Sequence, residues 1–398
     1  MAEPTAPSPE PNGARPSRRA LLAGTAGLGL AGAFGWWQAA PRNATGQRPI
    51  PQPGSSAMVS FPPTLTNQQL AGQRVIYSYP GATPPPSLLS DISAGLVGGV
   101  IFFGENITGT SQITGVISQL RQAAAHSPVK LPLLLMTDQE GGLVRRLPGQ
   151  PTLSAKQMGQ AADPLAAASA GGTGAGQNLR GVGMNVNLAP VLDVFYTAGN
   201  FIDQYQRSFS NNAATVAALG SAFISAQQAT AVAATAKHFP GLGSAATSQD
   251  TDTGSVTLNV SQNQLHTIDE VPYPAAISAG VMLIMCSWAV YPALDASLPA
   301  GLSPTIVSGE LRGRNGFRGV TITDALEAGA LAAYGTTAQR AVKAAGAGMD
   351  LILCSARDVS QGESARGALA TALGDGSLDA TSFHAATRRI SWLRAALF

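Results

Sequence analysis

Short apolar runs recur along the chain from about residue 65, separated by alanine-rich segments with helical spacing. Each run is apolar throughout rather than alternating, which is typical of parallel strands buried on both faces. Strands that alternate with helices build either a closed (β/α)8 barrel or a doubly wound open sheet. The eight runs are residues 74–79, 98–103, 131–137, 184–193, 231–238, 281–287, 319–323 and 350–354.

Polar residues at the ends of these runs favour the barrel over the open sheet. In a closed barrel the C-terminal ends of all strands face one site, whereas an open sheet leaves most of them far apart. We therefore predict an α/β fold, a single catalytic TIM barrel over residues 64–398. The polar residues that follow the runs are Asp138, Asp193, Lys237 with His238, and Asp324.

The first 63 residues have a different character. Within residues 1–40, Arg18-Arg19 precede a glycine-broken apolar run, Ala20 to Trp37, which predicts a twin-arginine-type export signal. A transmembrane anchor is the alternative, but the run is weakly apolar and barely long enough to span a bilayer. Residues 41–63 are rich in Pro, Gly and Ser and predict a linker. We expect an exported protein, extracellular or at the cell surface, that meets a membrane only through an uncleaved signal.

The charge and the cysteine content limit the kinds of partner and cofactor that the chain is expected to bind. The formal net charge is +2, and no Lys/Arg run occurs outside the extreme N-terminus, which argues against nucleic acid. Cys286 and Cys354 each end an apolar run, so we expect two buried, unpaired thiols, with a disulfide as the alternative. Without a histidine cluster or zinc-type cysteine spacing, no metal or other cofactor is expected. The expected state is a monomer.

The stretch from Thr235 to Thr253 contains several side chains that could bind a substrate or take part in catalysis. Lys237 and His238 are adjacent in a chain that has only four lysines and four histidines. A Pro-Gly-x-Gly turn and a loop with Asp250 and Asp252 follow. A plain strand-to-helix turn would explain the glycines. It would not explain a lysine and a histidine that end an apolar strand, because such groups are costly to bury without partners.

This KHFPG stretch resembles the substrate-binding loop of glycoside hydrolase family 3, in particular its single-domain β-N-acetylglucosaminidase (β-N-acetylhexosaminidase) branch. The segments DQEGGLVRR, GMNVNLAPVLDV, RSFS, AKHFPG, VYPALD and GVTITDAL occur in that branch's order, over residues 70–355. The resemblance implies that Asp324, the aspartate of the TDAL-type motif, is a catalytic nucleophile. It also implies sugar contacts from Asp138, Arg146, Arg207, Lys237 and His238.

The chemistry of glycoside hydrolysis agrees with this assignment. A retaining glycosidase needs two carboxyl groups about 5 Å apart, one to attack the anomeric carbon and one to protonate the leaving oxygen. Asp324 follows the β-branched run Val320 to Thr323, so strand packing would fix its position. The alternative role for Asp324 is the N-cap of a helix.

The chain differs from the family in the loop that carries the general acid/base residue. Members of the branch carry Asp-Ser-His there, with the histidine as general acid/base, but this chain has Asp250-Thr251-Asp252 in a longer loop. Leu242 stands where the family usually has histidine, and Ser287-Trp288 where it has Ala-His. Longer relatives supply an acid/base from a second domain, which we do not expect in a chain that ends at Phe398. The other histidines, expected in helical or connecting segments, are His126, His266 and His384.

Two hypotheses follow. In the first, Asp252 or Asp250 replaces the histidine, and the sequence does not decide between them. In the second, the chain is a catalytically impaired carbohydrate-binding relative. We predict the enzyme, an exported retaining β-glycosidase acting on cell-wall-derived or other β-linked amino sugars, with a β-glucosidase as the alternative. We expect Leu242, Trp288 and Tyr291 to line the pocket.

Overall fold

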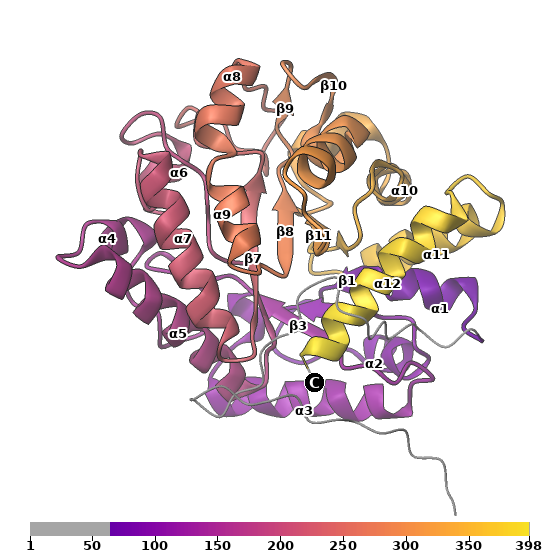
Figure 1. Ribbon diagram of the computed structural model, residues 1–398. Helices are drawn as coiled ribbons and strands as arrows, with labels where there is room; N and C mark the ends of the chain where they lie inside the picture. The colour runs from indigo at the N-terminus through magenta and orange to yellow at the C-terminus, as the bar shows by residue number, and fades with distance from the viewer. Residues whose placement is uncertain (1–63, 398) are drawn as a thin grey trace, which may run out of the picture.

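The computed structural model describes residues 64–397, so the predicted export signal and linker lie outside the described residues. Eight parallel strands form its central sheet, in the order β11-β8-β7-β6-β3-β2-β1-β12 (Figure 1). Each strand coincides with one of the eight predicted runs. The bounds are β1 Val75–Tyr77, β2 Gly99–Ile101, β3 Leu134–Thr137, β6 Val186–Asn187, β7 Ala233–Phe239, β8 Leu283–Cys286, β11 Val320–Thr323 and β12 Ile352–Leu353.

The sheet closes on itself. β12 pairs in parallel with β1, and a parallel bridge between Ile322 and Leu351 joins β11 to the start of β12. Side chains of each strand alternate between two cores. Ile76 packs inside the ring of strands, while its neighbours Val75 and Tyr77 pack outward against helices. The barrel prediction is therefore confirmed, and the open-sheet alternative is wrong.

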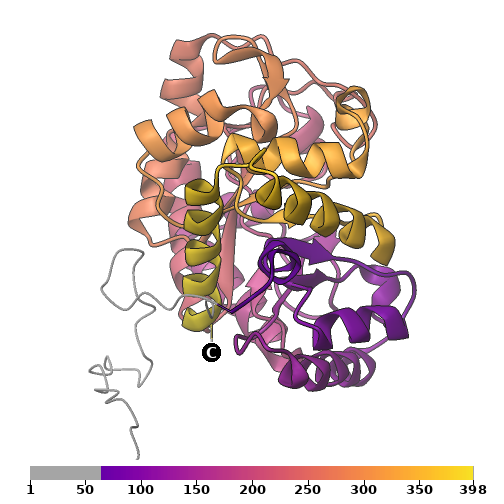
Figure 2. The same ribbon diagram turned by 90° about the vertical axis from the view of Figure 1, so that its right-hand side faces the viewer.

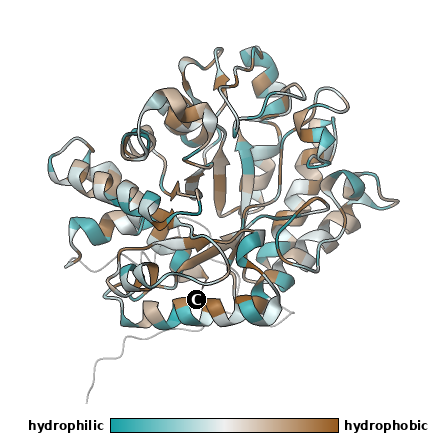
Figure 3. Cartoon of the chain, turned by 180° about the vertical axis from the view of Figure 1, so that it is seen from behind, coloured by the Kyte–Doolittle hydropathy of each residue, from teal (hydrophilic) through white to brown (hydrophobic). Residues whose placement is uncertain are grey.

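Helices surround the barrel, and Figure 3 shows both apolar and polar colours on them, as expected where one face meets the core and the other meets water. The α-helices are α1 Asn67–Gly72, α2 Pro86–Ser93, α3 Thr110–His126, α4 Ala155–Gly159, α5 Pro164–Val182, α6 Phe201–Gln204, α7 Ala213–Gln228, α8 Gln262–Gln264, α9 Pro272–Ser278, α10 Thr337–Ala347, α11 Val359–Gly374 and α12 Ala380–Ala396. Short 3-10 and π-helical elements are η1 Gly104–Asn106, η2 Leu265–Asp269, η3 Ala300–Leu302, η4 Thr305–Arg314 and η5 Gly329–Tyr334.

The two ends of the described chain meet where the ring closes. α1 packs on α11, and Figure 2 shows the yellow C-terminal helices beside the indigo N-terminal segment. Asp350, fully buried before β12, accepts from Arg312 of η4 and Arg389 of α12, and from the backbone N–H of Thr321 in β11. Burial works to raise the pKa of Asp350, but the two guanidinium groups hold it below its usual value. This carboxylate therefore ties together the last elements of the barrel.

Two small hairpins extend the strands at the same end of the barrel. β4 (Gln139–Gly141) pairs with β5 (Val144–Arg145) directly after β3, and β9 (Val290–Tyr291) pairs with β10 (Asp295–Pro299) after β8. These hairpins do not belong to the eight predicted runs.

Cys286 and Cys354 are both buried and free, which confirms the prediction of two unpaired thiols. Among the helices of residues 64–397, none has the length and apolar character needed to cross a bilayer.

Candidate active site

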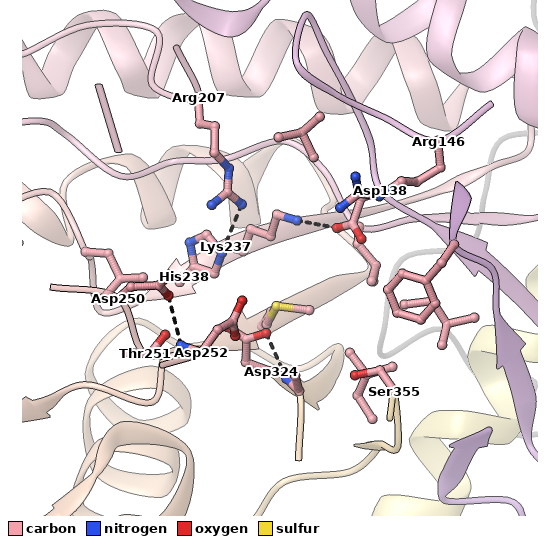
Figure 4. Close-up of a pocket in the computed structure, with 18 of the residues that line it drawn as sticks. Asp138, Arg146, Arg207, Lys237, His238, Asp250, Thr251, Asp252, Asp324 and Ser355 are labelled. Atoms are coloured by element: carbon pink, nitrogen blue, oxygen red, sulfur yellow. Dashed lines mark hydrogen bonds and ion pairs between the residues drawn. The ribbon is translucent and has the colours of Figure 1, made fainter. Parts of the chain in front are cut away.

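A cavity of about 200 Å³ opens at the C-terminal ends of the strands (Figure 4). This volume lies below the ~300–1,000 Å³ of a drug-sized ligand pocket, so the enclosed part has room for one small unit. Every site residue named from the sequence lines this cavity: Asp138, Arg146, Arg207, Lys237, His238, Asp250, Asp252 and Asp324.

One wall is a chain of alternating charges. Lys237, at the end of β7, is buried, and its Nζ lies 2.7 Å from Asp138 Oδ1 and 2.8 Å from Glu140 Oε1. Arg207, which follows α6, donates to both oxygens of Glu140 at 2.7 and 2.9 Å. Burying any one of these charges alone would cost several kcal/mol, so the four groups depend on one another.

The pairing keeps Glu140 and Lys237 ionised. Burial works to raise the pKa of Glu140, but Arg207 and Lys237 hold it well below its usual range. Burial likewise works to lower the pKa of Lys237, and Asp138 and Glu140 keep it above its usual value. Sequence reasoning missed Glu140, although a buried lysine needs more than one acceptor and Glu140 stands in the same DQEGG segment as Asp138.

Asp193 fixes the orientation of His238. The ring Nδ1 lies 2.7 Å from Asp193 Oδ2, and Asp193 Oδ1 accepts the backbone N–H groups of His238 and Leu242. The ring Nε2 faces Arg207 Nη2 at 3.4 Å. A guanidinium can only donate, so a ring that directs Nδ1–H to Asp193 presents Nε2 as the acceptor to Arg207. His238 is thus held as a bridge between Asp193 and Arg207.

Asp324 lies directly after β11, is half-buried and lines the cavity. Its Oδ1 accepts the N–H of Ala325 at 2.8 Å. No α-helix begins at Asp324, because a turn and η5 follow it and the next helix, α10, starts at Thr337 with Thr336 as its cap. The N-cap alternative for Asp324 is therefore wrong.

The loop that carries Asp252 is attached to the chain just beyond Asp324. The carbonyl oxygens of Thr251 and Asp252 accept the N–H groups of Ala330 and Gly329 at 3.0 and 2.9 Å. A side chain at Gly329 would approach the backbone of Thr253 to 2.6 Å, so only glycine permits this contact. Asp252 and Asp324 are thereby held on neighbouring, hydrogen-bonded segments.

Asp250 and Asp252 have different surroundings. Asp250 Oδ1 accepts the backbone N–H of Asp252 at 2.9 Å, so Asp250 shapes the loop. The Asp252 carboxyl reaches the open cavity. Partial removal from water, followed by the charges of Asp324 and Asp250, raises the pKa of Asp252 to about 6.

Of the three residues that we expected to line the pocket beside the charged groups, one does so. Leu242 lines the cavity, but the prediction was wrong for Trp288 and Tyr291. Trp288 is buried and donates from Nε1 to the carbonyl of Ala325, and the Tyr291 hydroxyl donates to the carbonyl of Gly241. Both rings support active-site loops from behind, because each polar atom finds a backbone partner there.

The other lining residues were not singled out from the sequence. They include Phe103 after β2 and Ser355 after β12. His126 and His384 lie in α3 and α12, and His266 lies in η2, and none of the three lines the cavity.

Comparison with known proteins agrees with this geometry. Residues 78–393 match the model of the glycosyl hydrolase family 3 N-terminal domain. An uncharacterized secreted glycosyl hydrolase of Arthroderma benhamiae is 47% identical over 82% of this chain and 93% of its own length. Beta-hexosaminidase A of Pseudoalteromonas piscicida is 31% identical over 84% of this chain, which spans 62% of that enzyme.

Solved structures show the same likeness. A family 3 beta-N-acetylglucosaminidase from a Paenibacillus species superposes with a TM-score of 0.79 at 33% identity, over 84% of this chain and 63% of that one. The beta-N-acetylhexosaminidase of Beutenbergia cavernae superposes with a TM-score of 0.74 at 34% identity, over 82% of this chain and 97% of that one. The chain belongs to glycosyl hydrolase family 3 and is a glycoside hydrolase.

Proposed function

We propose that this glycoside hydrolase is an exported retaining β-N-acetylhexosaminidase that works through a covalent glycosyl-enzyme on Asp324. The observation that carries the proposal is the pairing of Asp324 with Asp252, whose pKa is raised to about 6. Two carboxyl groups with different environments are what a retaining mechanism needs, since one must attack as an anion while the other donates a proton.

In the first step, the Asp324 carboxylate attacks the anomeric carbon as the glycosidic bond breaks, and Asp252 gives its proton to the leaving oxygen. In the second step, Asp252 takes a proton from water, the resulting hydroxide attacks the same carbon, and Asp324 leaves. Strand β11 fixes the position of Asp324, and the bonds to Gly329 and Ala330 fix the loop of Asp252. Asp252 is favoured over Asp250, because Asp250 Oδ1 is engaged by the loop backbone.

The charged wall suits the binding of sugar hydroxyl groups. Asp138 and Arg146 lie at the cavity, and Arg146 Nε is buried without a hydrogen-bond partner among the described residues. A donor left open in this way is available to a substrate hydroxyl. Lys237, Arg207 and His238 hold the acceptor and donor groups of this wall in place.

The identity of the sugar rests on the relatives. Those named as beta-hexosaminidase or beta-N-acetylglucosaminidase align over most of this chain. The apolar lining residues, among them Phe103, Leu188 and Met285, offer packing for a ring face or an acetyl methyl group. A small cavity further favours a single terminal sugar. Fragments of cell-wall glycan are suitable substrates for an exported enzyme, and the Arthroderma relative is named as a secreted glycosyl hydrolase.

Chromogenic substrates test the sugar. We expect kcat/KM for 4-nitrophenyl β-N-acetylglucosaminide to exceed that for the matching β-glucoside by about 10- to 200-fold, the range that one extra group in a pocket supplies. A faster β-glucoside would establish the β-glucosidase alternative. If both sugars bind in calorimetry but neither is cleaved, the protein is a binding relative.

Replacement of the proposed nucleophile tests the mechanism. Asp324→Ala should lower kcat on every substrate by at least about 10⁴-fold, because no glycosyl-enzyme can form. Binding of the product sugar, measured by calorimetry, should persist. Asp375→Asn, which removes an exposed carboxylate after α11, is the control and should leave both values unchanged. Retention of more than about 1% of activity in Asp324→Ala would exclude this role.

Azide rescue of asparagine variants should distinguish the roles of Asp252 and Asp250. Asp252→Asn should lower kcat on a natural disaccharide by about 10²- to 10⁴-fold, and much less on a dinitrophenyl glycoside, whose leaving group needs no proton. Azide should restore turnover of the activated substrate and yield a glycosyl azide, because azide attacks without a general base. Asp250→Asn is the matched control, since the amide oxygen still accepts the N–H of Asp252. Rescue in Asp250→Asn alone would exchange the two roles.

The pH profile should report Asp252. An acid must be protonated to act, so kcat/KM on a natural disaccharide should fall as the pH rises through about 6. Asp250→Asn removes a charge that raises this pKa, so the alkaline limb should move to lower pH. An alkaline limb that stays in place, or moves upward, would show that another group supplies the proton.

A further inference from the structure

A second cluster of titratable side chains lies outside the catalytic cavity. His266 of η2, Glu270 directly after η2, and Glu310 of η4 each offer one ligand atom, and the three atoms lie within 4.8 Å of one another. η2 follows α8 on the outside of the barrel, and η4 precedes β11, so the cluster joins segments on either side of β8. None of the three residues lines the cavity that contains Asp324.

One polar atom of each residue in this cluster makes no hydrogen bond to the described residues. Glu270 is 1% exposed, and its Oε1 has no partner among the described residues. His266 Nε2 and Glu310 Oε2 are also buried without a hydrogen bond; they lie 3.3 Å apart, a contact that is an ion pair when His266 is protonated. Buried polar atoms are almost always satisfied. Three unsatisfied atoms at one point indicate a group that binds all of them together.

The geometry suits a transition-metal ion. Zinc binds imidazole nitrogen and carboxylate oxygen at about 2.0–2.2 Å, which places neighbouring ligand atoms of a tetrahedral site about 3.4 Å apart. The 3.3 Å between His266 Nε2 and Glu310 Oε2 agrees with that spacing. His266 and Glu270 are four residues apart, so one helical turn brings both to the same side.

Neighbouring residues orient the most buried ligand. Arg314 Nη1 and Asn315 Nδ2 both donate to Glu270 Oε2. Oε1 is left as the oxygen free to bind, an arrangement like the outer-shell hydrogen bonds that hold metal-ligating carboxylates. Arg314 also lies 3.9 Å from Glu310 through its Nε. A divalent cation would add positive charge beside the two carboxyl groups of this cluster.

We infer that His266, Glu270 and Glu310 bind one Zn²⁺-type transition-metal ion, with water completing its coordination. The ion links η2 to η4 and stabilises the outer side of the barrel next to β8. It takes no part in glycoside hydrolysis, because its ligands lie outside the catalytic cavity. The sequence analysis expected no metal, and it gives no sign of this proposed site, since Glu310 joins the His-x-x-x-Glu pair only in the folded chain.

Zinc binding to the exported chain tests the site without any substitution. After chelator treatment and dialysis, added Zn²⁺ should bind in about one equivalent, and Tm should rise because the ion binds only the folded state. Mg²⁺ should not reproduce the rise, because it prefers octahedral oxygen ligands. Crystals soaked with zinc should give an anomalous peak among the three side chains. No peak there, or a peak only at the catalytic cavity, overturns the inference.

Two substitutions and two controls assign the binding. His266→Gln and Glu310→Gln should each weaken zinc binding in calorimetry by at least about tenfold, the loss seen even for outer-shell changes. His126→Gln removes an exposed histidine at the end of α3 and should bind zinc like the wild type. Asp252→Asn should also bind it unchanged. Loss of binding in Asp252→Asn but not in the two site variants would place the ion in the catalytic cavity and refute the site.

Discussion

The burial of Lys237 is the constraint on which the active site depends. The residue is 2% exposed, and its ammonium group is held by Asp138 and Glu140 from the segment after β3. Removing one partner of a buried pair costs about 3–5 kcal/mol, because a charge is left without compensation. Arg207 completes the chain from a third segment. These groups can meet only when the barrel brings β3 and β7 to the two sides of β6, so folding and site assembly are coupled.

On the opposite wall of the cavity, the carboxyl groups are not paired with cations of the described chain. Asp250, Asp252 and Asp324 gather without a salt bridge to a cation among the described residues, and partial removal from water, followed by the charges of Asp324 and Asp250, raises the pKa of Asp252. A sugar bound between the walls would meet neutralised charges that hold its hydroxyls on one side and an acid with a carboxylate on the other. The attachment of the Asp252 loop to Ala330 keeps the acid close to Asp324. In the proposed mechanism the sugar-binding groups come from β7 and the segments after β3 and β6, and the reacting carboxyl groups come from the loop after β7 and the end of β11.

The sequence predicted what depends on local pattern. Uninterrupted apolar runs located all eight strands, and polar residues at their ends located the cavity, because barrel closure leaves those residues only one place to meet. It did not distinguish Asp250 from Asp252, because hydrogen bonds to the distant residues Gly329 and Ala330 set that loop. It missed Glu140 and misplaced Trp288, since long-range packing decides the direction in which such a side chain points.

Trapping the glycosyl-enzyme tests the central claim most directly. A fluorinated N-acetylglucosaminyl fluoride slows hydrolysis of the intermediate more than its formation, so the adduct should accumulate. Digestion and tandem mass spectrometry should then find the sugar on Asp324 alone, in the peptide that contains the end of β11. A sugar attached to another residue, or an active enzyme that hydrolyses its substrate with inversion and accumulates no adduct, would contradict the account.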